Sequence, residues 1–329
     1  MLNGNACVRL APASDPAYQM AYRRYALQPH ESMRDTALEC NLLVAHGVSL
    51  CKEVYEPILS RISSVRGDAI SYEVRNHGDS GVVNAELLEE NSDLDAIFYD
   101  SVRDTRALIN TLRLTKRRPL IGIGHSGGGT LMLCTEIMYP GTFEAIIVID
   151  PILSATAEAL PARNSNHTSA ADFGDVMANM ALHEKRTVVW LNATFTAVGL
   201  MRLWAHTLQT HGLRDLEDGT GVALKCTPHQ EAMTFLSRMH PMHNVYRRIS
   251  DIRIPVLFIS AEHSELMQVA RRPVELLRAT AARCRQGRHV MVPNVGHMLP
   301  LQDPNAVANV ISQFIRDIRR NTTPIQANL

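Results

Sequence analysis

The sequence lacks an excess of charge of either sign, because lysine plus arginine and aspartate plus glutamate both number 33 among its 329 residues. It also lacks long runs of one charge, so electrostatics gives no support for nucleic acid or an anionic membrane surface as a partner. No apolar stretch approaches the length of a membrane span, so we expect no integral membrane segment.

The six cysteines are scattered, and none of them forms a C-x-x-C pair. This favours free buried thiols in a reducing compartment over disulfides or a zinc site. No histidine–carboxylate spacing suggests another metal site, so we expect neither a metal nor a cofactor. The first fourteen residues lack the apolar segment of a secretory signal. These absences predict a soluble, intracellular protein.

Hydrophobic residues make up 46% of the sequence, enough for a large core. Continuous apolar runs predict buried strands at 41–45, 69–74, 119–123, 145–149, 254–259 and 289–293. Helical spacing of apolar residues predicts helices at 49–62, 94–114, 130–139, 274–284 and 304–319. Strands that alternate with helices indicate parallel β-α-β units, and therefore an α/β fold with a doubly wound, mostly parallel sheet.

Residues 151–248 interrupt this alternation and show no convincing strand pattern. We expect a helical cap there, inserted into a sheet domain formed by residues 1–150 and 249–329. The segment is rich in methionine and tryptophan. Methionine adapts to irregular apolar ligands, so the cap suggests a lipophilic small-molecule substrate. The same side chains would equally serve as the core of the cap itself.

A glycine-rich turn, Gly124-His125-Ser126-Gly127-Gly128, joins the strand expected at 119–123 to the helix that follows. In this G-x-S-x-G context the serine occupies the apex of a strained strand-to-helix turn, which exposes its hydroxyl group. We therefore predict that Ser126 is a nucleophile. We interpret its neighbour His125 as structural.

A serine hydroxyl is a poor nucleophile near neutral pH and needs an adjacent base. Among 14 histidines, His297 is the best candidate because it follows the last expected strand and precedes the final helix. It should therefore lie on a loop at the carboxyl edge of the sheet, where Ser126 must also lie.

Five motifs in the same order resemble those of the α/β-hydrolase family with a helical cap: His46-Gly47, RNHGDS at 75–80, GHSGGG at 124–129, IPVLFISAEHS at 254–264 and NVGHMLP at 294–300. The resemblance covers nearly the whole chain after about residue 38. Within the family, the chain looks nearest to fungal lipase- and toxin-biosynthesis-type hydrolases, several of which are peroxisomal. The order of serine first and histidine last is also that of the family.

The resemblance implies a carboxylate that orients His297, and two residues are available for this role. The family's usual position, in the loop after the strand at 254–259, holds Ser264 instead of aspartate. Asp150 ends the strand that follows the nucleophile helix, as in a branch of the family that carries its acid there. Glu262 lies in the usual loop but two residues early. We favour Asp150 and retain Glu262 as the alternative.

The resemblance further implies that the main-chain N–H groups of Gly127 and Val48 stabilise the oxyanion. We predict a serine hydrolase that cleaves an ester or thioester through a Ser-His-acid triad and an acyl-enzyme. The alternatives are a carbon–carbon hydrolase, acyltransferase or cyclase in secondary metabolism, and a non-catalytic ligand-binding protein of the same fold. Epoxide hydrolases and dehalogenases of this fold would need aspartate at position 126, and the glycine pattern is not that of a dinucleotide-binding turn.

The last three residues, Ala327-Asn328-Leu329, keep the small first residue and the terminal leucine of the S-K-L peroxisomal signal but lack its basic residue. Both cytoplasm and peroxisome agree with the cysteine content. The sequence leaves a homodimer open.

Overall fold

The computed structural model describes residues 7–90, 94–153, 206–216, 221–237, 239–264 and 274–322. Nine strands form one sheet in the order β1-β2-β5-β4-β6-β7-β10-β11, with β3 paired to β5. Strands β1 (Arg9–Pro12) and β2 (Gln19–Leu27) are antiparallel to their neighbours. All other pairs in this sheet are parallel. The mostly parallel α/β sheet predicted from the sequence is therefore confirmed.

The central strands are completely buried. They are β4 (Asn41–Ala45), β6 (Leu120–His125), β7 (Ala145–Ile149) and β10 (Val256–Ala261). Their continuous apolar sequences suit parallel strands that are covered on both faces. The chain runs from β4 to β5 in one direction and then returns to place β6 on the other side of β4. Ligands of such sheets bind at the carboxyl ends of the strands, beside this reversal.

Alternate side chains of each central strand enter two separate cores. In β4, Leu42 and Val44 pack on one face of the sheet, whereas Leu43 and Ala45 pack on the other. This two-residue period is the ordinary geometry of a strand. Burial of each such leucine or isoleucine side chain contributes about 1.5–3 kcal/mol to the free energy of folding.

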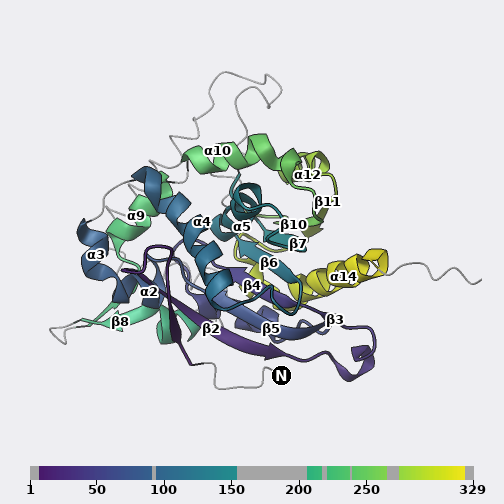
Figure 1. The fold of residues 1–329 in the computed structure, drawn as a ribbon, viewed down its shortest axis with the longest axis horizontal. Helices are drawn as coiled ribbons and strands as arrows, with labels where there is room; N and C mark the ends of the chain where they lie inside the picture. Colours follow the sequence, from purple (N-terminus) through teal and green to yellow (C-terminus); the bar gives the residue numbers. More distant parts are fainter. Residues whose placement is uncertain are drawn as a thin grey trace, which may run out of the picture.

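The first face is covered by α1 (Glu56–Leu59), α13 (Leu299–Gln302) and α14 (Pro304–Thr322). The second face is covered by α4 (Leu94–Thr111), α5 (Gly127–Met138), α10 (Met239–Arg248) and α12 (Val274–Arg283). Figure 1 shows the two layers, with α14 in yellow on one side and α4, α5 and α10 together on the other. None of the described helices is long and apolar enough to cross a membrane.

The remaining elements around the sheet are η1 (Glu31–Met33), β3 (Leu38–Glu39), η2 (Lys52–Tyr55), β5 (Val65–Tyr72), α2 (Gly78–Val83), α3 (Ala85–Glu90), η5 (Ile249–Asp251) and β11 (Gly287–Val292). The single helix expected at 49–62 is in fact the short 3₁₀ helix η2 followed by the one-turn α1. Ser49 has a positive φ of 67°, so a regular helix cannot begin there.

The described part of residues 206–248 contains η4 (Leu208–Gly212), β8 (Leu213–Asp215), β9 (Val222–Leu224) and α9 (Pro228–Ser237), followed by α10. Helix α9 packs against α4, and α10 packs against α5. Strands β8 and β9 pair as an antiparallel ribbon that the sequence did not predict. Each has only three residues, too few to show an alternating pattern. Most of the methionines and tryptophans expected in the cap lie outside the described residues.

All six cysteines are free thiols. Five are buried as expected, whereas Cys7 is exposed.

Candidate active site

Ser126 occupies the turn between β6 and α5 in a strained conformation. Its φ is 54° and its ψ is −122°, outside the regions that a non-glycine residue ordinarily adopts. The Ser126 N–H donates to Ile149 O at 2.9 Å, and Ser126 O accepts from the Gly129 N–H at 3.0 Å. These bonds hold a geometry that costs about 1–3 kcal/mol.

Two glycines make this turn possible by letting main chains approach closely. A Cβ on Gly124 would lie 2.2 Å from Gly128 O, and a Cβ on Gly128 would lie 2.4 Å from Ala45 O. Any side chain at either position would therefore displace backbone. The requirement explains why the sequence around Ser126 is rich in glycine.

Asp150 follows β7 directly and is completely buried. Its Oδ2 lies 2.6 Å from His297 Nδ1 and accepts a hydrogen bond from the Ser264 hydroxyl at 2.5 Å. Its Oδ1 accepts from the Ala261 N–H at 3.4 Å. The carboxylate is thus held by the end of β10 and the loop after it, and it meets the imidazole through one oxygen.

Glu262, the alternative acid, lies on the surface of the same loop, with 37% of its side chain exposed. Its Oε2 accepts from the Asn294 N–H at 2.8 Å and lies 3.7 Å from His263 Nε2. These partners turn the carboxylate toward the Asn294 backbone. The described geometry brings Asp150, rather than Glu262, to the Nδ1 atom of His297.

His297 lies between β11 and α13, at the carboxyl edge of the sheet. Its ring stacks against that of His125, with centroids 4.9 Å apart and planes inclined by 34°. His125 also bonds through Nε2 to His297 O at 2.9 Å. Because His125 is the residue before Ser126, these contacts bring the imidazole of His297 beside the nucleophile turn. A proton on Nδ1, facing Asp150, makes Nε2 the basic nitrogen.

The predicted oxyanion donors lie on the two segments that flank Ser126. Gly127 is the first residue of α5, where main-chain N–H groups have no partner within the helix. Val48 lies in the loop after β4, and its side chain packs against Ala232 and Phe235. This loop lies against Ser126, because a Cβ on Gly47 would lie 3.2 Å from Ser126 Cβ.

Residues 225–234 contact the segments that follow β4 and β5 through polar side chains. The Ser49 hydroxyl donates to the carboxylate of Glu231, a residue of α9 that is only 5% exposed. Asn76 donates from Nδ2 to Thr234 Oγ1 at 2.7 Å, and Lys225 Nζ lies 2.5 Å from Asp79 Oδ1. Nothing in the sequence pattern identified Glu231, because a single acidic residue on a helix ordinarily faces solvent.

Buried charges lie below this attachment point. Lys52 is fully buried, and its Nζ lies 2.6 Å from Asp79 Oδ2, 3.0 Å from Glu53 Oε1 and 3.3 Å from Glu73 Oε2. Burial raises the pKa of Glu73 to about 7. Its carboxylate also accepts from the Asp79 N–H at 2.7 Å, at the start of α2. Asp79, from the RNHGDS motif at 75–80, thus joins a buried charge cluster with Lys52, Glu53 and Glu73.

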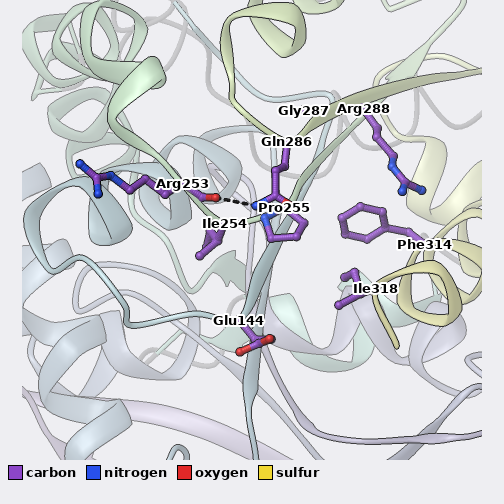
Figure 2. Close-up of a pocket in the computed structure, with 9 residues that line it drawn as sticks. All are labelled: Glu144, Arg253, Ile254, Pro255, Gln286, Gly287, Arg288, Phe314 and Ile318. Atoms are coloured by element: carbon purple, nitrogen blue, oxygen red, sulfur yellow. Dashed lines mark hydrogen bonds between the residues drawn. The ribbon is translucent and has the colours of Figure 1, made fainter. Parts of the chain in front are cut away.

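A separate pocket of about 550 Å³ lies at the opposite edge of the sheet. Figure 2 shows the nine residues that line it: Glu144, Arg253, Ile254, Pro255, Gln286, Gly287, Arg288, Phe314 and Ile318. Several of them directly precede β7, β10 and β11, at the amino ends of these strands. The predicted catalytic residues follow the carboxyl ends, so this pocket is not part of their site.

Comparison with known proteins identifies the family. A model of the alpha/beta hydrolase family matches residues 42–310, and the chain belongs to this family. The resemblance stated from the sequence motifs is therefore confirmed. Within the part of the chain that the structure describes, no group of three or more histidine, cysteine, aspartate or glutamate residues is arranged to hold a metal ion.

Fungal relatives share shorter stretches. The type I acyl-CoA thioesterase mpaH' of Penicillium brevicompactum is 32% identical over 123 residues, or 36% of this chain and 28% of that protein. The peroxisomal membrane protein LPX1 of Saccharomyces cerevisiae is 27% identical over 145 residues, or 41% of this chain and 36% of that protein. These matches span about a third of the relatives' length. The crystal structure of the peroxisomal alpha-beta-hydrolase Lpx1 has a TM-score of 0.69 at 18% identity, covering 97% of this chain and 86% of that one.

Proposed function

We propose that this member of the alpha/beta hydrolase family is a serine hydrolase that cleaves an ester or thioester of a lipophilic small molecule. The observation that supports this most strongly is the 2.6 Å contact between Asp150 Oδ2 and His297 Nδ1. It lies beside a serine held at a φ of 54° by the turn that follows β6. In this proposal Ser126, His297 and Asp150, all at the carboxyl edge of the sheet, serve as the nucleophile, the base and the group that orients the base.

In this proposal His297 Nε2 takes the proton of the Ser126 hydroxyl as its oxygen attacks the substrate carbonyl carbon. Asp150 keeps the proton on Nδ1 and stabilises the imidazolium that forms. The N–H groups of Gly127 and Val48 bind the oxyanion, and each such donor is worth about 3–4 kcal/mol. The imidazolium then gives its proton to the leaving alcohol or thiol. Water releases the acyl group through the same steps in reverse.

Asp150 is the acid in this proposal, because burial removes competing water from its bond to the imidazole. The Ser264 hydroxyl stands where the family usually has aspartate, and it donates to the Asp150 carboxylate at 2.5 Å. Ser264 and Asp150, which occupy the two positions where the family carries its acid, therefore contact each other beside His297. We propose that the serine supports the acid supplied by the preceding strand.

The thioester half of the substrate proposal is supported by the name of the Penicillium relative, an acyl-CoA thioesterase. The yeast relative's name supports a peroxisomal location in the same way. Both remain proposals, since the matched stretches cover about a third of those proteins.

The proposed function is tested by turnover of p-nitrophenyl esters and acyl-CoA thioesters of increasing chain length. Wild type should hydrolyse one or both series, and Ser126→Ala should lose turnover while keeping its circular-dichroism spectrum and melting temperature. Unaltered turnover in Ser126→Ala would refute the nucleophile. Slow turnover of both series, together with reaction of a ketonic or carrier-bound substrate, would instead indicate carbon–carbon or acyl-transfer chemistry. A wild type that reacts with none of these would be a binding protein.

A further inference from the structure

A buried tyrosine and a buried histidine connect the two loops that meet above Ser126. Tyr55, in η2, is 2% exposed, and its hydroxyl oxygen accepts the Gly47 N–H at 3.0 Å. The same hydroxyl lies 3.0 Å from His125 Nδ1. His125, 1% exposed, reaches His297 O through Nε2 at 2.9 Å. The chain of hydrogen bonds therefore runs from the loop after β4 to the loop after β11.

The direction of each hydrogen bond follows from chemistry. A carbonyl oxygen can only accept, so His125 Nε2 must carry the proton that is given to His297 O. A neutral imidazole then has its lone pair on Nδ1, which must accept from the Tyr55 hydroxyl. The Tyr55 oxygen is left to accept from Gly47. Every donor in the bridge has one acceptor, and a single tautomer satisfies all three bonds.

The bridge keeps this arrangement across the pH range in which a serine hydrolase works. Burial, and next the charge of the neighbouring His297, lower the pKa of His125 to about 3. Burial also raises the pKa of Tyr55 above its ordinary value, so the hydroxyl remains a donor. A neutral His125 places no positive charge beside His297 at the moment when that ring becomes an imidazolium.

We propose that Tyr55 and His125 are positioning residues, which fix the Val48 loop and the His297 loop at one separation around Ser126. The inference rests on the proposed function and concerns the same site. The Gly47 backbone lies close to both residues of the next strand end, because a Cβ there would lie 3.1 Å from His125 Nδ1 and 3.2 Å from Ser126 Cβ. An oxyanion donor and a general base contribute fully only when held at their working distances, and the bridge sets both together.

Tyr72 offers a matched control for Tyr55. It is also fully buried, and its hydroxyl bonds to Thr105 Oγ1 at 2.6 Å. Tyr72 lies in the second core, under α4, whereas Tyr55 belongs to the first. Either change removes a buried hydrogen bond, so both should lower the melting temperature, although Thr105 still donates to Ser101 O at 2.7 Å after loss of the Tyr72 hydroxyl. Only the change at position 55 should affect catalysis.

The experiment compares wild type, Tyr55→Phe, Tyr72→Phe and Ser126→Ala in the full chain. The readouts are kcat and KM for the best ester substrate, the rate of labelling by a fluorophosphonate, and inhibition by a trifluoromethyl ketone. We expect Tyr55→Phe to lower kcat and the labelling rate about 10- to 100-fold, with KM within about twofold. Affinity for the ketone should fall in parallel, because it forms the oxyanion. Tyr72→Phe should keep kcat within about twofold.

Histidine variants divide the bridge into its two halves. His125→Asn places an acceptor near the position of the imidazole Nδ1 atom, whereas His125→Gln places a donor near the position of Nε2. His125→Gln and Tyr55→Phe both remove the Tyr55–His125 bond, so the double variant should lose much less than the product of the two single losses. A loss of kcat in the double variant equal to the product of the two single losses would contradict the proposed bridge.

Wild-type kcat in Tyr55→Phe, or an equal loss in Tyr72→Phe, would also overturn it. Failure of the proposed function gives a different result, because Ser126→Ala would then retain turnover and labelling.

Discussion

Replacing Asp150 by asparagine separates the two candidate acids. The carboxylate receives the His297 Nδ1–H and the Ser264 hydroxyl on Oδ2, and the Ala261 N–H on Oδ1. Asparagine must place its NH₂ group at one of these two positions. With the NH₂ group at the Oδ2 position, asparagine faces His297 Nδ1 and forces the wrong imidazole tautomer, with the proton on Nε2. With the NH₂ group at the Oδ1 position, asparagine opposes the Ala261 N–H. The Nδ1–H tautomer of His297 is then kept, but the negative charge of the acid is lost.

Both outcomes weaken the base, by different amounts. Loss of the charge alone removes the stabilisation of the imidazolium, and the wrong tautomer removes the base itself. We expect kcat/KM to fall about 10²- to 10⁴-fold, which corresponds to about 2.7–5.5 kcal/mol in the activation free energy. The fold should persist, because the substitution is isosteric.

Glu262→Gln is the matched control. Glutamine retains an oxygen that can accept the Asn294 N–H, and the side chain is partly exposed. Its kcat/KM should therefore stay within about twofold of wild type. The assay is steady-state ester hydrolysis, with the melting temperature recorded for each variant. Near-wild-type activity in Asp150→Asn, combined with a large loss in Glu262→Gln, would refute the assignment of the acid.

Two further predictions concern stability. Gly124→Ala should prevent folding or lower the free energy of unfolding by about 3 kcal/mol or more, because its Cβ would lie 2.2 Å from main-chain oxygen. Gly141→Ala, with a φ of 80° and no atom within 4 Å of its Cβ, should cost only about 1 kcal/mol in a urea titration; equal losses would contradict the packing argument. His125 has its folded pKa lowered from 6.5 to about 3, so its contribution to stability is present above pH 6.5 and is lost as the pH falls toward 3. His125→Gln should reduce this acid slope by on the order of 1 kcal/mol per pH unit in urea titrations at several pH values; a slope equal to that of wild type would contradict the burial argument.

Local patterns in the sequence identify the parts of the fold that depend on neighbours along the chain. The strand at 145–149 is predicted to the residue, since five consecutive apolar residues are what a strand covered on both faces requires. Ser126 is predicted from a five-residue motif, and His297 from its place after the last strand. The structure places both at the carboxyl edge of the sheet.

Features that depend on contacts between distant segments are not visible in the sequence. The choice between Asp150 and Glu262 stays open there, because nothing local shows that the Ser264 hydroxyl reaches across to the carboxylate at the end of β7. Tyr55 lies within the helix expected at 49–62, and nothing in that pattern singles it out. Its link to His125 depends on how β4, β6 and the loop after β11 meet in three dimensions.

Mapping a covalent adduct tests whether Ser126 is a nucleophile that His297 and Asp150 activate. Wild type is treated with a fluorophosphonate, digested and analysed by mass spectrometry, alongside His297→Ala and Asp150→Asn. We expect one adduct, on the peptide that contains Ser126, formed at least about 100-fold more slowly in His297→Ala. An adduct on another residue, or labelling of Ser126 at the wild-type rate without His297, would contradict it.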